Sequence, residues 1–526
     1  MQQSQDAEAA RAVGIAQVFR QSARQHADRV AVESQDGVRL TYRDLDRLAA
    51  GVAAFLLRQG VGRGDRVAVM SDPCPEYIAV NLAVAKLGVT VVGINTRYGV
   101  RDAEYCVRDS GAKIVFFDRR HREVAEEAAG AADRVELDLH GSGGGRTRSL
   151  GAVLESTDPA SVPELGRPSD IHTVIYTSGT TGQPKGAMIS QAAAAVRALR
   201  LVSWFGLTGR DAFLGWLPLF HTSGEEPLNA TFLSGGRYLT FRRADPERLV
   251  EAVDDRGGTW SWFLPGMFAE FLDAARARRS PLRGLRFGGG YGNLLPARLL
   301  DDLLERGVDF VDLFGQTESS LLVAANRISG TGERDWRKYP TPMLDIRIVR
   351  PDGSETEVGE PGECVVRGPS VMSGYLNRPE ATAETFQGGR LHTGDLLVRT
   401  HDGALRFVDR KKYLIKTGGE NVYPLEVEAA LASHPDVAEA CVIGVPDDRW
   451  GETVKAFVVP HPGRAPDRAA LDAHCQSRLA RFKRPRLIEF IDGRDVPRST
   501  TGKVIRSELG ARPVRDDQRV PSPPSP

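Results

Sequence analysis

Runs of apolar, β-branched residues alternate with helical patterns through the first part of the chain. Residues 66–69 read as a strand and lead into a helical pattern at 76–87. Two further strand-like runs, 89–94 and 113–117, lie on either side of a helical pattern at 103–109. Apolar strands that alternate with helices are typical of parallel β-α-β units. The pattern therefore predicts an α/β fold with a parallel sheet.

The pattern changes beyond residue 400. There we expect short strands at 403–408, 442–445 and 454–459, and helices at 424–432 and near 468–480. These elements predict a small α+β domain. The last residues, PVRDDQRVPSPPSP, are rich in Pro and Ser, which is typical of disorder. We expect a large domain of residues 1–409, a small domain of residues 410–512 and a disordered tail of residues 513–526.

Composition excludes several classes of protein. Lys and Arg total 69, as do Asp and Glu, so the net charge indicates neither a nucleic-acid nor a membrane-surface partner. Five Cys lie in no CxxC pattern, which favours reduced thiols, no structural zinc and a cytoplasmic location. The N-terminus lacks the apolar segment of a signal peptide, and no apolar run approaches the roughly 18 residues of a membrane span.

The segment 176–186, YTSGTTGQPKG, is the strongest candidate for chemistry. It follows a buried strand pattern at 171–175 and precedes a strand-to-helix transition at 187–200. A Gly-rich turn after a strand can direct backbone N–H groups toward an anion, and Lys185 adds a positive charge. Further donors are the hydroxyls of Thr177, Ser178, Thr180 and Thr181. It is not a Walker loop, which would need Gly where Pro184 stands, but it predicts a polyphosphate site.

This segment is very similar to the phosphate-binding signature of the AMP-forming adenylate enzymes (the ANL superfamily). The family includes acyl-CoA synthetases, carrier-protein-loading adenylation domains and beetle luciferases. Four later segments resemble further motifs of the family, in the family's order: DLFGQTE at 312–318, LHTGD at 391–395, DRKKYLIK at 409–416 and PRSTTGK at 497–503. The resemblance implies a large N-terminal adenylate-forming domain, with parallel α/β subdomains and a β-barrel-like part, and a small mobile α+β C-terminal domain. It covers about residues 15 to 510.

The resemblance also implies ligands and their residues. ATP, Mg²⁺ and CoA are the expected cofactors. Phosphate contacts fall to Thr177, Ser178, Gly179, Thr180, Thr181, Gly182 and Lys185. Adenine would stack closely on Phe314 and Gly315, Gly289 and Gly290 would line both adenine and the acid, and Gln316 belongs to the same cofactor-binding set. Thr317 would contact the α-phosphate, and Glu318 with Thr180 would hold Mg²⁺.

The remaining roles fall to residues on both sides of the expected domain boundary after residue 409. Asp395 and Arg410 would bind the ribose, Lys412 would be the hinge, and Lys503 would be the catalytic lysine of adenylation. A loop that enters the site for thioester formation would comprise Gly418, Gly419 and Glu420. FKRP at 482–485 and DDRWGE at 447–452 resemble CoA-ligase elements, so Arg449, Lys483 and Arg484 are either contacts for CoA phosphates or ordinary surface cations.

The acid pocket is where this sequence departs from the family. His221, in LPLFH, would orient the substrate carboxylate unless it is a packed core histidine. It is followed by Glu225 and Glu226, which either point away, form a salt bridge within the protein, or meet a substrate with a cationic or hydrogen-donating group. A second departure is FGGGYGN at 287–293, and the nearby aromatic stripe of Trp260, Trp262, Phe263 and Met267 is either pocket wall or core. A medium-sized, aryl or polar acid fits as well as a fatty acid.

Two functions fit these residues. The first is ATP-dependent activation of a carboxylic acid to an acyl-adenylate, with pyrophosphate release and transfer to CoA. The alternative is an adenylate-forming enzyme with another acceptor: a stand-alone carrier protein, or an amine, as in amide formation or small-oxyacid activation. CoA dependence discriminates the two. A non-catalytic binding protein is disfavoured because Thr180, Glu318, Asp395, Arg410 and Lys503 are all present. The oligomeric state is open, a homodimer included.

Overall fold

The computed structural model describes residues 13–139, 147–155, 162–177, 183–291, 295, 297–330, 334–498 and 504–520. The chain forms two compact units. Unit 1 comprises Met1–Ile346 and Val366–Thr393, and unit 2 comprises Arg347–Val365 and Gly394–Pro526. The boundary at 409/410 remains a prediction about where the chain hinges.

Unit 1 contains an eight-stranded sheet, ordered β19-β9-β8-β4-β3-β5-β6-β7. Its strands are β3 (Arg66–Met70), β4 (Thr90–Gly93), β5 (Ile114–Phe117), β6 (Asp133–Glu136), β7 (Thr147–Ser149), β8 (Ile171–Thr177), β9 (Lys185–Ser190) and β19 (Gly374–Tyr375). The strands β3, β4 and β5 pair in parallel. The parallel arrangement predicted from the alternating pattern is thereby confirmed.

The second sheet of unit 1 has nine strands in the order β16-β15-β14-β13-β12-β10-β11-β1-β2. Its strands are β1 (Val30–Ser34), β2 (Arg39–Thr41), β10 (Ala212–Gly215), β11 (Arg237–Thr240), β12 (Trp260–Trp262), β13 (Phe287–Gly290), β14 (Asp309–Gln316), β15 (Ser320–Ile328) and β16 (Tyr339–Pro340). The parallel neighbours β12, β13 and β14 are followed by the antiparallel β15. This change of direction creates the tight turn that carries the DLFGQTE motif.

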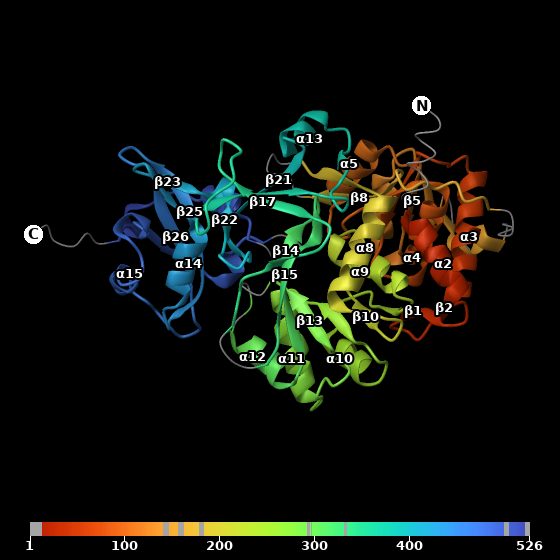
Figure 1. Ribbon diagram of the computed structural model, residues 1–526, viewed down its shortest axis with the longest axis horizontal. Helices are drawn as coiled ribbons and strands as arrows, with labels where there is room; N and C mark the ends of the chain where they lie inside the picture. The colour runs from red at the N-terminus through yellow and green to blue at the C-terminus, as the bar shows by residue number, and fades with distance from the viewer. Residues whose placement is uncertain are drawn as a thin grey trace, which may run out of the picture. The chain divides into compact units, whose positions relative to one another are not determined.

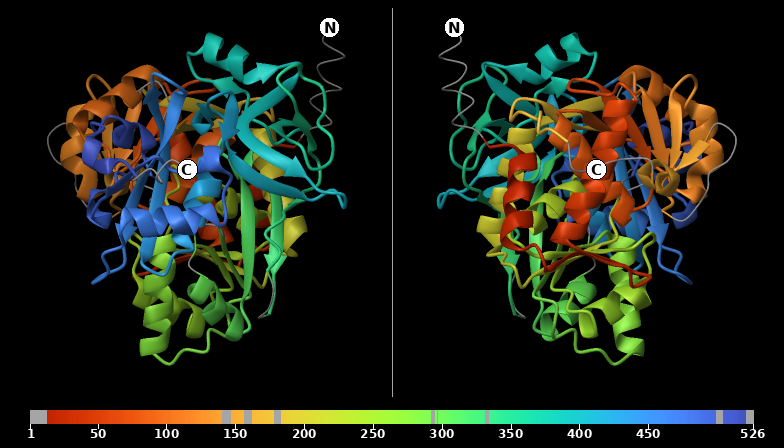
Figure 2. Two further views of the ribbon diagram at one scale, coloured as in Figure 1. Left: turned by 90° about the vertical axis from the view of Figure 1, so that its left-hand side faces the viewer. Right: turned by 90° about the vertical axis from the view of Figure 1, so that its right-hand side faces the viewer.

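Helices cover both sheets of unit 1. They are α2 (Ile15–Gln25), α3 (Tyr42–Arg58), α4 (Pro75–Leu87), α5 (Val100–Ser110), α6 (Arg122–Ala128), α7 (Leu150–Glu155), α8 (Gln191–Phe205), α9 (Thr222–Leu233), α10 (Pro246–Asp254), α11 (Pro265–Ala277), α12 (Ala297–Glu305) and α13 (Pro379–Thr385). Helix α8 contacts strands of both sheets. It is also packed against α9, whereas α10, α11 and α12 group together at another side of the unit (Figures 1 and 2). Because α8 is buried between the sheets, polar side chains on it must find partners inside the protein.

A five-stranded sheet, ordered β17-β18-β21-β20 with β22 beside β21, contains the boundaries of the two units. Its strands are β17 (Asp345–Val349), β18 (Pro361–Arg367), β20 (Phe386–Gln387), β21 (Arg390–Arg399) and β22 (Leu405–Arg410). Within the described residues no helix is both long and apolar enough to cross a membrane.

Unit 2 also has a sheet of its own, in which β27 joins the order β24-β23-β26-β25. Its elements are β23 (Ile415–Thr417), β24 (Glu420–Val422), α14 (Pro424–Ala432), β25 (Val437–Asp447), β26 (Gly451–Pro460), α15 (Arg468–Gln476), β27 (Leu487–Phe490) and α16 (Arg506–Gly510). Helix α14 has the bounds expected from the sequence. The predicted α+β character of this part is confirmed.

The disordered tail was predicted to begin at residue 513, and this starting point is wrong. Asp516–Gln518 forms a turn of 3-10 helix, and the N–H of Val520 donates to the carbonyl of Arg486 at 2.9 Å. The Gln518 side chain is buried and donates to Glu489 Oε2 at 2.9 Å. These contacts tie the segment to β27, which composition could not show.

Candidate active site

The predicted phosphate loop lies in a hairpin between β8 and β9. Thr177 is paired with Lys185, and its hydroxyl donates to the Lys185 carbonyl at 3.3 Å. Ser178, Gly179, Thr180, Thr181 and Gly182 lie outside the described residues. The hairpin therefore brings Thr177 and Lys185, eight residues apart, to the same edge of the loop.

Helix α5 holds the base of this hairpin. The Tyr176 hydroxyl donates to Asp109 Oδ2 at 2.8 Å, and the Tyr105 hydroxyl donates to the Pro184 carbonyl at 3.2 Å. Arg378 lies 3.1 Å from Asp109 Oδ1. Both ends of the loop are thus tied to one helix.

The DLFGQTE motif ends β14 and turns into β15. Gln316 is paired with Ser320, so the turn spans 317–319. Gly315 is required by this geometry, because a Cβ there would lie 2.2 Å from the Ser320 carbonyl oxygen. Phe314, the predicted adenine contact, is nearly buried. Ser320 has a positive φ of 99°, which side chains other than glycine rarely adopt.

Tyr375 links Glu318 to the phosphate hairpin. Its hydroxyl donates to Glu318 Oε1 at 2.8 Å. Lys185 Nζ lies 5.5 Å from the centre of the same ring. Burial, with Glu318 nearby, raises the pKa of the Tyr375 phenol, so it remains a donor. The structure therefore brings the predicted phosphate lysine and the predicted metal ligand to one tyrosine, which sequence reasoning missed.

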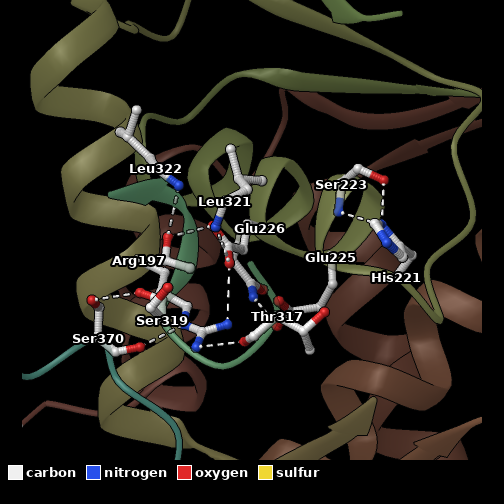
Figure 3. Close-up of polar contacts among 12 residues, drawn as sticks. Arg197, His221, Ser223, Glu225, Glu226, Thr317, Ser319, Leu321, Leu322 and Ser370 are labelled. Carbon is white, nitrogen blue, oxygen red and sulfur yellow. Dashed lines mark hydrogen bonds and ion pairs between the residues drawn. The ribbon is translucent and has the colours of Figure 1, made fainter. Parts of the chain in front are cut away.

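A buried ion pair lies behind the turn (Figure 3). Arg197, on α8, lies 3.1 Å from Glu226 Oε1, on α9, and both side chains are completely buried. Arg197 also donates to the Thr317 carbonyl at 3.1 Å and to the Ser370 carbonyl at 2.8 Å. Burial raises the pKa of the Glu226 carboxyl, and Arg197 opposes that shift. Glu226 thus forms the internal salt bridge that was one of the alternatives for this acidic segment.

Arg200 holds the start of β15 from the next turn of α8. Its Nη1 donates to Ser370 Oγ at 2.9 Å, its Nε donates to the Pro342 carbonyl at 3.0 Å, and it also donates to the Leu322 carbonyl. Burial lowers its pKa to about 10. Neither arginine was singled out from the sequence, because arginines in an Ala-rich helix give no sign of being buried.

Glu225 points into the core rather than pairing with an arginine. Asn229 Nδ2 donates to its Oε1 at 2.6 Å, and His172 Nε2 lies 3.9 Å from the same oxygen. Burial, and then the neighbouring Glu226, raise the Glu225 pKa to about 7. Burial alone lowers the His172 pKa to about 4. Both side chains are buried in the interior of unit 1.

His221 is the residue that precedes α9. Its Nδ1 accepts from the Ser223 N–H at 3.2 Å and lies 2.7 Å from Ser223 Oγ (Figure 3). Burial lowers its pKa to about 4, so the ring is neutral at physiological pH. With Nδ1 engaged, Nε2 is the nitrogen that can contact a carboxylate.

The glycines of β13 allow neighbouring groups to approach the strand closely. A Cβ on Gly289 would lie 2.3 Å from the Trp262 ring, and one on Gly290 would lie 2.6 Å from the Phe263 carbonyl oxygen. Trp262 packs against Phe205 and belongs to the main core of unit 1. The aromatic stripe is therefore core, and packing alone explains Gly289.

In unit 2 the two predicted ribose residues meet. Asp395 and Arg410 are paired across β21 and β22, and Arg410 Nε lies 2.8 Å from Asp395 Oδ1. Asp395 is almost fully buried. Lys412, the predicted hinge, lies just beyond, with its Nζ 4.8 Å from the centre of the Tyr413 ring.

The glycine pair of unit 2 forms the turn between β23 and β24. Gly418 and Gly419 have φ values of 59° and 85°, as a two-residue hairpin requires, and exposed Glu420 follows. A Cβ on Gly418 would lie 2.8 Å from the Trp450 ring. The guanidinium groups of Arg449 and Arg486 each lie 4.7 Å from the centre of a ring of Trp450.

The other two cations considered for CoA have acidic partners. Lys483 lies 2.8 Å from Glu426, and Arg484 lies 3.4 Å from Asp472. These ion pairs favour the second alternative for both residues, that they are ordinary surface cations and not contacts for CoA phosphates.

Lys503 lies outside the described residues, but both ends of its loop are described. Arg498 and Val504 form an isolated β-bridge, and the Ile505 N–H donates to the Pro497 carbonyl at 2.8 Å. Arg506 then pairs with Glu428 at 2.5 Å. The residues on either side of the segment that contains Lys503 are thus anchored within unit 2.

Comparison with known proteins identifies the family. A family model described as AMP-binding enzyme matches residues 19–376, and one described as AMP-binding enzyme C-terminal domain matches residues 426–503. The chain belongs to the AMP-binding enzyme family. The resemblance inferred from the five motifs is confirmed.

Curated relatives of this family member include CoA ligases. A feruloyl-CoA synthase of Amycolatopsis sp is 36% identical over 90% of this chain and 94% of its own. A 2-succinylbenzoate–CoA ligase of Geobacillus kaustophilus is 35% identical over 92% of this chain and 94% of its own. Among solved structures, ATP-bound MatB from Rhodopseudomonas palustris has a TM-score of 0.82 and 28% identity, covering 95% of this chain and 98% of that one. The predicted class, an AMP-forming acid:CoA ligase, is confirmed by these comparisons.

Proposed function

We propose that this family member acts on an aryl acid and converts it to the CoA thioester in two steps. In the first, a carboxylate oxygen attacks the α-phosphorus of ATP, and pyrophosphate leaves. In the second, the CoA thiolate attacks the acyl carbon, and AMP leaves. The names of the feruloyl and 2-succinylbenzoate relatives support an aryl acid.

The observation that best supports the first step is that Lys185 and Glu318 both contact Tyr375, Lys185 at the ring and Glu318 at the hydroxyl. Lys185 would neutralise the β- and γ-phosphates, and the Thr317 hydroxyl would donate to the α-phosphate. The residues present suit Mg²⁺, because Glu318 is a half-buried carboxylate with only one oxygen used by Tyr375. Mg²⁺ held by Glu318 and Thr180 would supply positive charge at the phosphate oxygens. Neutral His221 would orient the acid through Nε2.

Unit 2 would supply the ribose contacts, the hinge and the catalytic lysine of adenylation. Asp395 accepts from ribose hydroxyls in this proposal while Arg410 fixes the carboxylate. Lys503 neutralises the approach of one anion to another, and Lys412 absorbs the backbone change between the two steps. Gly418, Gly419 and Glu420 would lie beside the pantetheine arm, where a bare backbone leaves room.

The test is pyrophosphate release across aliphatic, aryl and amino-substituted acids, each with and without CoA. An aryl acid that releases pyrophosphate and forms a thioester only with CoA is the expected result. Pyrophosphate release with no thioester would instead favour a carrier protein or an amine as the acceptor.

Glu318→Ala tests the metal assignment separately. We expect kcat/KM for Mg·ATP to fall about 10- to 100-fold, with a shifted Mg²⁺ dependence. An unchanged Mg²⁺ titration would refute the role of Glu318.

A further inference from the structure

The turn that carries Thr317 and Glu318 ends in an unfavourable backbone conformation. Ser320 has a φ of +99°, a region that costs any residue with a Cβ and is natural only to glycine. Such a conformation persists when the surroundings hold it, and it is often found at functional sites. Ser320 is completely buried, so its hydrogen-bond partners must come from the protein.

Glu226 contacts both Ser320 and the next residue, Leu321, and Figure 3 labels Glu226 beside Leu321. Its Oε2 accepts from the Ser320 hydroxyl at 2.8 Å, and its Oε1 accepts from the Leu321 N–H at 3.2 Å. Charge-assisted hydrogen bonds of this kind are stronger than neutral ones. One carboxylate thus holds both the side chain of the strained residue and the backbone of the next.

Arg197 holds the other end of the same turn. Its Nη2 donates to the Thr317 carbonyl at 3.1 Å, while its Nη1 holds Glu226. The planar guanidinium fixes these partners relative to each other, which a lysine could not do. The turn is therefore held at Thr317 by the arginine and at Ser320 by the glutamate.

From this geometry we propose that Arg197 and Glu226 are positioning residues for ATP, which hold the backbone so that Thr317 and Glu318 face the nucleotide. The inference rests on the proposed roles of Thr317 and Glu318. It gives Glu226, the second of the two acidic residues after His221, a function that is neither substrate recognition nor stability alone.

The main variant replaces both charges with apolar groups: Arg197→Met with Glu226→Leu. Replacing a buried ion pair by apolar residues of similar volume often preserves stability, so the double variant separates positioning from folding. We expect the dissociation constant for Mg·ATP, measured by calorimetry, to rise about 10- to 100-fold, and kcat/KM for ATP to fall by a similar factor. The KM for the acid should stay near the wild-type value.

A second variant tests the backbone mechanism. Adding Ser320→Gly to the double variant makes the positive φ intrinsically favourable, so most of the lost ATP affinity should return. If the double variant does not fold, Glu226→Gln with and without Ser320→Gly is compared instead. Gln retains an oxygen acceptor, so a smaller loss is expected, again reversed by the glycine.

Glu33→Gln is the matched control. Glu33 is a buried carboxylate on β1, at the far end of the same nine-stranded sheet, with Arg237 at 2.9 Å and Arg256 at 2.8 Å. It should lower thermal stability without changing ATP affinity. The inference is overturned if the double variant binds ATP like the wild type, or if its loss of ATP affinity is no larger than that of Glu33→Gln. It is also overturned if Ser320→Gly restores none of the lost ATP affinity. A wild-type protein that binds no ATP would overturn the proposed function and this inference together.

Discussion

Two groups of arginines in this protein are used in opposite ways. In unit 1, Arg197 and Arg200 are buried, and their guanidinium groups hold the carbonyl of Thr317, within the DLFGQTE motif, and that of Leu322, in the strand that follows. In unit 2, Arg449 and Arg486 are exposed, and the guanidinium of each lies 4.7 Å from the centre of a ring of Trp450. An arginine whose donors are all taken by groups inside the protein acts as structure, whereas one at the surface can meet a phosphate.

The difference teaches that burial, more than residue type, decides what a charge does. A buried ion must be paired, so it fixes the groups around it. An exposed ion keeps its hydration and can exchange it for a ligand. The predictions below separate the fixed charges of unit 1 from the available groups of unit 2.

The largest effect is expected for Lys503→Ala. Removing the cation that is proposed to offset the repulsion between the attacking carboxylate and ATP should lower adenylation about 100- to 1,000-fold. Thioester formation from a supplied acyl-adenylate and CoA should be spared, which a stopped assay of each half reaction can measure. Equal loss in both half reactions would contradict the assigned role.

The next largest effect is the difference in the free energy of unfolding between removing a buried cation, Arg197, and removing a surface cation, Lys483. Arg197→Ala leaves the Glu226 carboxylate buried without its partner and should lower the free energy of unfolding by about 3–5 kcal/mol. Lys483→Ala breaks a partly exposed pair with Glu426 and should cost about 0–1 kcal/mol. Urea unfolding of both variants measures the difference. Similar losses for the two would refute the distinction between fixed and surface charges.

Glu225→Gln should change the pH dependence of stability. The Glu225 pKa is about 7 in the folded protein and 4.5 for the ordinary side chain, so the folded state binds the extra proton between these values. The wild-type carboxyl therefore favours folding below pH 4.5, and this contribution disappears as the pH rises through 7. Relative to wild type, the glutamine variant should gain up to about 3 kcal/mol at pH 8 compared with pH 4.5. Thermal unfolding of both proteins across this range tests the sign, and parallel curves would contradict the raised pKa.

The smallest effect is expected at the glycine turn of unit 2. Gly418→Ala and Gly419→Ala both place a Cβ at positive φ, which costs about 1–2 kcal/mol. Only Gly418→Ala also meets Trp450, whereas nothing lies within 4 Å of a Cβ on Gly419. We expect a several-fold larger rise in KM for CoA with Gly418→Ala, measured in the thioester half reaction. Equal values for the two variants would exclude Trp450 as part of the CoA contact.

The sequence by itself determined the elements and the family. Strands β3, β4 and β5 and helix α14 follow from local apolar periodicity, which reports which face of an element is buried. The five motifs predicted the family because each is a short local run whose order can be read along the chain. The roles of Thr180 and Lys503 stay predictions, since both residues lie outside the described ranges.

Only the tertiary structure decided what the charges do. Glu226 meets Arg197 from 29 residues away and Ser320 from 94, and Arg197 reaches Thr317 across 120 residues. Tyr375 reaches Glu318 across 57 residues in the same way. No local pattern reports such contacts, because a charged residue in a helix looks the same in sequence whether its surroundings are water or protein. The sheet order places α8 and α9 in the interior, and that burial makes their charges part of the site's framework.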